Sequence, residues 1–170
     1  QTKQTKQTKQ TKNKASQNNK KSSLYSRVTP PVKTEPVKIS FLGGINEVGK
    51  NMTCYEYAKS MLIVDCGLSF PESDQLGVDF VIPDFTFVER NADKLKGVII
   101  THGHEDHIGA IPYVLNEIHA PIYGSRLALG LVENKLKEYP KIKAKFVSVK
   151  ERQTINLGCF TVEFIHVNHS

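Results

Sequence analysis

The sequence predicts a mixed α/β fold of the α+β type, and three observations lead to this expectation. Short apolar segments separated by glycine-containing turns begin at Val37, which is typical of β-strands. Two later segments carry apolar residues at helical spacing and lie between strand-like segments. The apolar run from Val98 to Ile100 leads directly into a group of His and Asp residues. A chain of 170 residues is long enough for one domain with a buried core.

Residues 1–36 form an N-terminal tail of different composition. They begin with repeated Gln-Thr-Lys triplets and end in a segment that contains Pro30, Pro31 and Pro36. The tail carries a charge of +8, so residues 37–170 carry −2 of the net +6. We predict that the tail is disordered, because it cannot bury enough apolar surface to offset its conformational entropy. It could serve as a solubilising extension, or its Lys side chains could make weak contacts with RNA or ribosomes.

The first folded segment is expected to be a β-meander. Its strands are predicted at Val37 to Leu42, Met52 to Tyr57 and Met61 to Asp65. Three glycines lie between the first two strands, but their spacing matches neither the P-loop nor the dinucleotide-binding pattern, so they predict a tight turn. The segment from Phe70 to Asp84, with two prolines and four acidic residues, is expected to be a long ordered loop.

Two helices and several strands are expected after the His-rich segment. Ser125 should cap the second helix, in which Lys135, Lys137 and Glu138 are expected to form a solvated face. The predicted elements are, in order, a helix from Ile108 to Ile118, a strand from Pro121 to Gly124, a helix from Arg126 to Tyr139, and strands at Lys145 to Val149, near Thr154 and Ile155, and at Cys159 to Val167.

The cysteines and the absence of long apolar runs indicate a cytoplasmic protein. Cys54, Cys66 and Cys159 are odd in number and form no C-x-x-C pair, so we predict reduced thiols in the core rather than metal ligands. No apolar run approaches the length of a membrane span, and the N-terminal segment lacks the apolar core of a signal peptide. No membrane partner is therefore expected.

The most informative segment runs from Thr101 to His107. It places His102, His104, Asp106 and His107 within six residues at the end of an apolar strand, with a glycine that allows a tight turn. Imidazole and carboxylate groups together suit zinc or a similar divalent ion. If a helix follows directly, the two ligand pairs point in different directions. His102 and His104 could then face one ion, while Asp106 and His107 face a second.

A second acidic residue, Asp65, ends the third predicted strand. A carboxylate at the end of an apolar strand is costly unless it has hydrogen-bonding partners. Such a carboxylate can hold a ligating imidazole in one tautomer and orientation. A simple turn residue is the alternative interpretation of Asp65.

The pattern His102-x-His104-x-Asp106-His107 resembles the H-x-H-x-D-H signature of the metallo-β-lactamase superfamily. Three further segments, listed here in order, resemble the ribonuclease J family of its β-CASP group: Leu42 to Asn51, Val64 to Leu68, and Gly77 to Asp84. The resemblance implies an αββα sandwich, of which residues 37–170 would supply about the first half. It also implies that Asp65 supports the metal-ligand loop from outside the ligand shell.

The third ligand of the first ion is implied by the same resemblance. The ribonuclease J pattern has a His-Ser pair that matches His169 and the residue after it. His166 lies nearby, and on the residues alone either His could be structural. His119, beyond the first predicted helix, is expected to be a surface residue.

The resemblance implies a metal-dependent ribonuclease, with 5′ exonuclease and endonuclease activity in mRNA decay and rRNA maturation. Two divalent metal ions, Zn2+ or Mn2+, would activate water for phosphodiester hydrolysis, and Asp106 and His107 would be the catalytic pair. The implied partners are single-stranded RNA, a second copy or a paralogue in an oligomer, and ribosomes. The sequence ends before the superfamily's bridging Asp and the inserted β-CASP domain, so we expect an N-terminal part of a longer, more active enzyme.

Two other functions stay open at this point. A small-molecule hydrolase of the glyoxalase or β-lactamase type would use the same His-rich loop. A non-catalytic subunit that partners an active paralogue is the second alternative, although the loop in this chain keeps every residue of the motif.

Overall fold

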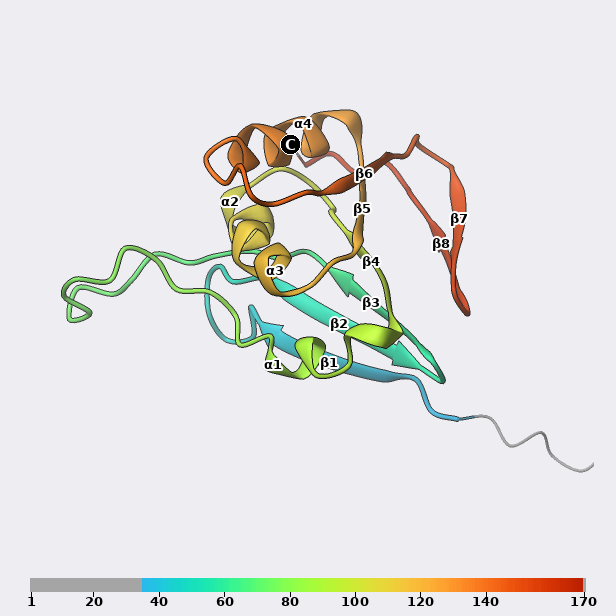
Figure 1. The fold of residues 1–170 in the computed structure, drawn as a ribbon, viewed down its shortest axis with the longest axis horizontal. Helices are drawn as coiled ribbons and strands as arrows, with labels where there is room; N and C mark the ends of the chain where they lie inside the picture. Colours follow the sequence, from blue (N-terminus) through green and yellow to red (C-terminus); the bar gives the residue numbers. More distant parts are fainter. Residues whose placement is uncertain (1–34, 170) are drawn as a thin grey trace, which may run out of the picture. The chain divides into compact units, whose positions relative to one another are not determined.

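The computed structural model describes residues 35–169, so the predicted disordered tail lies almost wholly outside the described residues. A six-stranded sheet with the strand order β1-β2-β3-β4-β5-β6 forms the centre of the described part (Figure 1). The first three strands form the predicted antiparallel meander, and β3 to β6 run parallel to one another. The strands are β1 (Lys38–Gly43), β2 (Met52–Tyr57), β3 (Ser60–Val64), β4 (Leu95–Ile99), β5 (Pro121–Gly124) and β6 (Lys145–Ser148).

Four α-helices and one 3-10 turn connect the parallel strands. They are α1 (Thr86–Glu89), the 3-10 turn η1 (Ala92–Lys94), α2 (Glu105–Ile108), α3 (Ile111–Glu117) and α4 (Arg126–Leu136). The predicted cap of α4 is confirmed, because the Ser125 hydroxyl accepts a hydrogen bond from the Ala128 amide at 3.2 Å. The long loop predicted between Phe70 and Asp84 is also confirmed, with one isolated bridge between Ser69 and Val81 at its base.

The single helix predicted from Ile108 to Ile118 is wrong, because the chain forms two helices there. The amide of Ala110, between them, donates to the carbonyl oxygen of Cys66 in the loop after β3. Pro112 lies in the first turn of α3, where its missing N–H costs no helical hydrogen bond. The break therefore ties the start of α3 to the loop that leaves β3.

The centre of the sheet is buried on both faces, whereas edge strand β1 is largely exposed, and each face has its own apolar cluster. Met61 and Ile63 of β3 belong to the cluster formed with the helices, whereas Leu62 between them belongs to the opposite cluster. The opposite face packs against a separate antiparallel hairpin of β7 (Thr154–Leu157) and β8 (Phe160–Glu163). Figure 1 shows α2, α3 and α4 on one side of the sheet and the β7–β8 hairpin on the other. The described residues thus build three layers, namely helices, sheet and hairpin.

The last predicted strand and one cysteine differ from expectation. The strand predicted from Cys159 to Val167 is only β8 in the structure, because Cys159 lies in the turn that precedes it. Cys54 and Cys66 are buried core thiols as predicted, but Cys159 is exposed. Burial raises the pKa of Cys54 to about 11 and raises the pKa of Cys66 as well. Among residues 35–169, no helix combines the length and apolar character that a membrane crossing requires.

Candidate metal centre

The site lies where the parallel strands end. Asp65 follows β3, and the loop from Thr101 to His104 follows β4, its parallel neighbour. Carboxyl ends of adjacent parallel strands meet at one edge of a sheet, which is where ligands bind in open α/β folds. Two polar segments separated by more than thirty residues in sequence are therefore neighbours in space.

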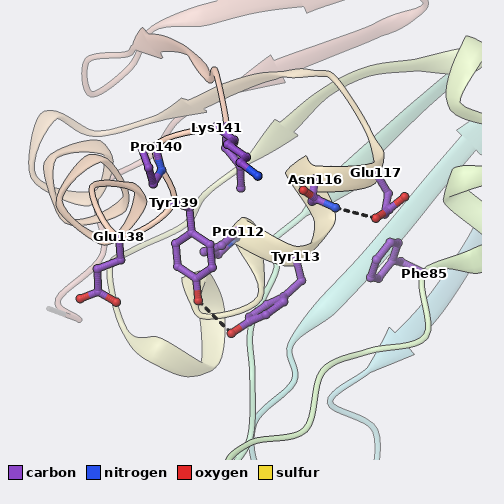
Figure 2. A pocket seen from close by; sticks show the side chains of 10 residues that line it. Phe85, Pro112, Tyr113, Asn116, Glu117, Glu138, Tyr139, Pro140 and Lys141 are labelled. Carbon is purple, nitrogen blue, oxygen red and sulfur yellow. Dashed lines mark hydrogen bonds between the residues drawn. The ribbon is translucent and has the colours of Figure 1, made fainter.

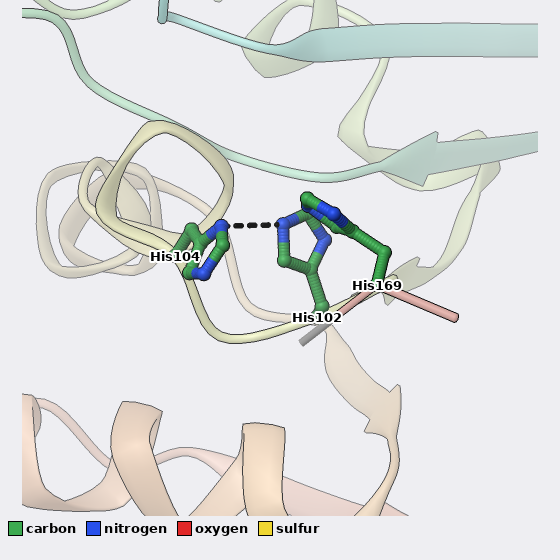
Figure 3. Close-up of side chains that lie close together, drawn as sticks. All are labelled: His102, His104 and His169. Atoms are coloured by element: carbon green, nitrogen blue, oxygen red, sulfur yellow. Dashed lines mark hydrogen bonds between the residues drawn. The ribbon is translucent and has the colours of Figure 1, made fainter. Parts of the chain in front are cut away.

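Three histidines gather at this edge. One ring nitrogen from each of His102, His104 and His169 lies within 4.8 Å of the others, and Nε2 of His102 is 3.1 Å from Nδ1 of His104. Figure 3 shows the three rings close together, and their centroids are 4.6 Å (His102–His104), 4.6 Å (His102–His169) and 5.2 Å (His104–His169) apart. Nitrogen ligands about 2.0–2.1 Å from a tetrahedral zinc ion are roughly 3.4 Å apart, so small movements of these rings would let them hold such an ion. His166 is exposed and does not belong to the cluster.

Burial favours the neutral form of the His102 imidazole. It lowers the pKa of His102 below its ordinary value, and the nearby imidazoles of the cluster add to the effect. A neutral imidazole keeps the lone pair that a metal ion needs. The electrostatics of the site therefore agree with the donor set.

Asp106 and His107 form a second pair beside the cluster. Oδ2 of Asp106 is 3.4 Å from Nε2 of His107, and the rings of His107 and His102 have centroids 4.1 Å apart. Both residues lie within α2, which begins three residues earlier than the helix predicted from Ile108. The structure thus brings all five candidate ligands to one place, with the carboxylate on the side of His107.

Asp65 is buried at 5% exposure and has a partner for each of its carboxylate oxygens. Its Oδ1 accepts from the amide of Thr101 at 2.8 Å, and its Oδ2 is 2.8 Å from Nδ1 of His107. The Thr101 hydroxyl is also within hydrogen-bonding distance of both oxygens. Because a carboxylate can only accept, Nδ1 of His107 carries a proton, and in the neutral imidazole Nε2 is then the acceptor. Asp65 thus contacts the loop as predicted, while the prediction that it supports metal binding stays a prediction.

The backbone of Asp65 adopts a φ of +60°, in the left-handed region that non-glycine residues rarely use. Asp and Asn tolerate this region better than most residues, because their short polar side chains can bond locally. This conformation costs free energy, and the hydrogen bonds to Thr101 and His107 offset it.

The loop is packed tightly against its neighbours. A Cβ added to Gly67 would overlap the carbonyl oxygen of Asp106, so only glycine fits between the loop after β3 and α2. On the other side, Lys135 of α4 forms an ion pair of 2.8 Å with Glu105. Of the residues predicted to form a solvated face of α4, Lys137 and Glu138 are exposed, whereas Lys135 is half-buried beside Glu105 of α2.

Two polar residues near the ligands were not predicted from the sequence. Thr101 directly precedes the motif, and its position just after β4 could have marked it as a residue near the ligands. Asn51 follows the glycine-containing turn between β1 and β2, and its side chain contacts both Asp106 and His107. No local pattern connects Asn51 with residues more than fifty positions later.

A pocket of about 470 Å³ lies elsewhere, between α3 and the segment after α4 (Figure 2). The hydroxyls of Tyr113 and Tyr139 meet there at 2.9 Å. Burial and this contact raise the pKa of Tyr113 to about 12. None of the candidate metal ligands lines the pocket, so it is separate from the metal centre.

Comparisons with known proteins show which family the chain belongs to. The chain is 46% identical over 136 residues to ribonuclease J of Helicobacter pylori, covering 79% of this chain and 20% of that protein. It is 44% identical over 142 residues to ribonuclease J of Mycolicibacterium smegmatis, covering 83% of this chain and 25% of that protein. The resemblance to the ribonuclease J family is thus confirmed. The chain spans about a fifth to a quarter of the length of these curated relatives.

A solved structure supports the fold. A protein of unknown function from Enterococcus faecalis V583 superposes with a TM-score of 0.57 at 16% identity, covering 78% of this chain and 38% of that one. The predicted mixed α/β architecture is therefore confirmed. Residues 46–169 match the model of the metallo-beta-lactamase superfamily, and the chain accordingly belongs to the metallo-β-lactamase superfamily.

Proposed function

We propose that this chain carries the metal centre of a metal-dependent ribonuclease. The observation that carries the proposal is the convergence of His102, His104 and His169 at the carboxyl edge of the sheet, beside the pair Asp106 and His107. RNA as the substrate is supported by the relatives named ribonuclease J at 44–46% identity. Single-stranded RNA is the form proposed, since the resemblance implies 5′ exonuclease and endonuclease activity.

The residues of the chain have separate tasks in this proposal. His102, His104 and His169 would hold one divalent ion, and Asp106 with Nε2 of His107 would begin the site for a second. Divalent ions bound here would lower the pKa of water and neutralise charge on a phosphodiester. Asp65 keeps the proton of His107 on Nδ1 through a contact of 2.8 Å, so that Nε2 remains available.

The finer assignments extend this proposal. Four imidazoles and one carboxylate across the two sites favour zinc, although manganese also binds such donors. We further propose roles in mRNA decay and rRNA maturation, a homo-oligomer or a hetero-oligomer with a paralogue, and contact with ribosomes. These assignments are supported by the resemblance to the ribonuclease J family.

The test compares His102→Ala with His119→Ala in the protein. His119 is exposed and lies outside the cluster, so it controls for the loss of one imidazole. We expect His102→Ala to lose bound zinc and at least 10-fold in cleavage of a 5′-monophosphorylated single-stranded RNA, since it removes a direct ligand. His119→Ala should match the unaltered protein in both measurements.

The same experiment separates the competing functions. Zinc content and RNA cleavage that are unchanged in His102→Ala would contradict the proposed metal centre. Normal zinc content without RNA cleavage in the unaltered protein would instead favour the small-molecule hydrolase or the non-catalytic subunit. Hydrolysis of a thioester or a β-lactam by that preparation would then decide between these two.

A further inference from the structure

The side chain of Asn51 lies between the two candidate ligands of the second ion. Its Nδ2 is 3.1 Å from Oδ2 of Asp106 and 3.2 Å from Nε2 of His107. The same nitrogen also donates to the main-chain carbonyl of Asp106 at 3.1 Å. One amide group therefore contacts the two atoms that would bind the ion and the backbone that carries one of them.

The surroundings determine which end of the amide faces the ligands. All three neighbours on the ligand side are acceptors: two oxygens of Asp106, and Nε2 of His107, whose proton is held on Nδ1 by Asp65. An amide oxygen in this place would face only other lone pairs, so the NH2 group belongs there. The oxygen lies on the opposite side, where a Cβ on Gly44 would come within 2.6 Å of it.

The main chain of Asn51 anchors the same region independently of its side chain. Its amide donates to the carbonyl of Asp106 at 3.0 Å, and its own carbonyl accepts from the amide of Gly67 at 3.0 Å. A change of side chain leaves these two hydrogen bonds possible. The role of the amide group can therefore be separated from the role of the strand start that carries it.

We propose that Asn51 is a positioning residue for the second ion. Its NH2 group holds the Asp106 carboxylate and Nε2 of His107 toward one point, so that less reorganisation is needed when an ion binds. When an ion takes those two lone pairs, the amide keeps its hydrogen bond to the main-chain carbonyl of Asp106, so it still holds the backbone that carries the carboxylate. The inference rests on the proposed function and adds a residue from the turn before β2 that the H-x-H-x-D-H pattern does not contain.

The test is a double-mutant cycle measured by zinc binding. Zinc bound to the full chain is counted by elemental analysis at a series of buffered free-zinc concentrations. Asn51→Ala is introduced into His102→Ala, which retains the Asp106–His107 pair, and into His107→Ala, which retains the histidine cluster. Asn116→Ala is the matched control, because Asn116 is exposed and its side chain donates only to Glu117 in the described contacts.

We expect Asn51→Ala to raise the free-zinc midpoint about 10-fold or more in the His102→Ala background, as for other residues that orient a ligand. In the His107→Ala background the second site has lost its imidazole, so Asn51→Ala should move the free-zinc midpoint by less than about 2-fold. An equal shift in both backgrounds, or no shift in either, would overturn the inference. If the unaltered protein binds no zinc, the proposed metal centre itself fails. This outcome differs from a failed double-mutant cycle, in which the unaltered protein binds zinc but the shifts do not depend on the background.

A thermal melt in excess chelator accompanies each variant. The melting temperature of Asn51→Ala should stay close to that of Asn116→Ala, because the main-chain hydrogen bonds of Asn51 remain. If Asn51→Ala does not fold, Asn51→Ser replaces it, since its side chain is one bond shorter and still polar. A selective loss at the second site in the serine variant would support the same conclusion, and an unchanged second site would contradict it.

Discussion

Asp65→Asn is the substitution that best tests how the metal centre is organised. It replaces one carboxylate oxygen by an NH2 group and keeps the size of the side chain. Asn tolerates the φ of +60° at this position, so the backbone is not strained further. The new NH2 group would face Nδ1 of His107, which must then accept a hydrogen bond and move its proton to Nε2.

The expected magnitude follows from the contacts of Asp65. The hydrogen bonds from the Thr101 amide and from His107 change from charge-assisted to neutral. Each change costs about 1 kcal/mol, so the free energy of unfolding of the metal-free protein should fall by roughly 2 kcal/mol. Zinc affinity at the site of His107 should fall by about 10–100-fold, because Nε2 would carry a proton.

Urea unfolding in chelator and zinc titration measure the two quantities separately. Asp74→Asn, in an exposed part of the long loop, is the matched control and should leave both unchanged. An Asp65→Asn protein that unfolds more easily but binds zinc with the original midpoint would refute the argument about the proton of His107. Asp65 would then be only a structural residue.

Three further predictions concern packing, thiol reactivity and the tail. Gly67→Ala should lower the free energy of unfolding by more than about 3 kcal/mol or prevent folding, because its Cβ would overlap the Asp106 carbonyl. Gly130→Ala in α4 has open space around it and should instead raise the free energy of unfolding by about 0.5–1 kcal/mol, as measured in thermal melts. A thiol reagent followed by mass mapping should label Cys159 in the native protein well before the two buried cysteines, and equal labelling of all three would contradict the described core. Deleting residues 1–36 should flatten the plot of log affinity for single-stranded RNA against log salt concentration, by a slope of about 0.7 per lost Lys–phosphate contact. Cleavage at saturating RNA should stay unchanged. Identical slopes with and without the tail would leave it as a solubilising extension.

Local patterns predicted most of the fold. The alternation of apolar segments and glycine turns placed β1, β2 and β3 within about one residue of their observed bounds, and Ser125 marked the start of α4. The failures involve contacts between distant segments. The break between α2 and α3 depends on the hydrogen bond from Ala110 to Cys66, which no helical periodicity reveals.

The same division applies to the candidate site. Four of its candidate ligands lie within six residues of the sequence, so their types and spacing indicated a metal site directly. His169 could be chosen over His166 only through the family resemblance, because both follow β8 in a segment without regular structure. Asn51 and Lys135 could not be predicted, because each acts on a residue at least thirty positions away.

The parallel pairing of β3 with β4 has a consequence for the alignment of the sheet. Both strands are buried on both faces, and the runs Met61 to Val64 and Val98 to Ile100 are apolar at every position. Sliding one strand past the other by a residue would bury nearly the same apolar surface, so hydrophobic burial alone specifies their alignment weakly. The polar strand ends remove this ambiguity, since the Asp65 amide donates to the Ile99 carbonyl at 2.8 Å and its carboxylate accepts from Thr101. The carboxylate that contacts a candidate metal ligand thus also fixes how the two central strands are aligned, so losing it would disturb both.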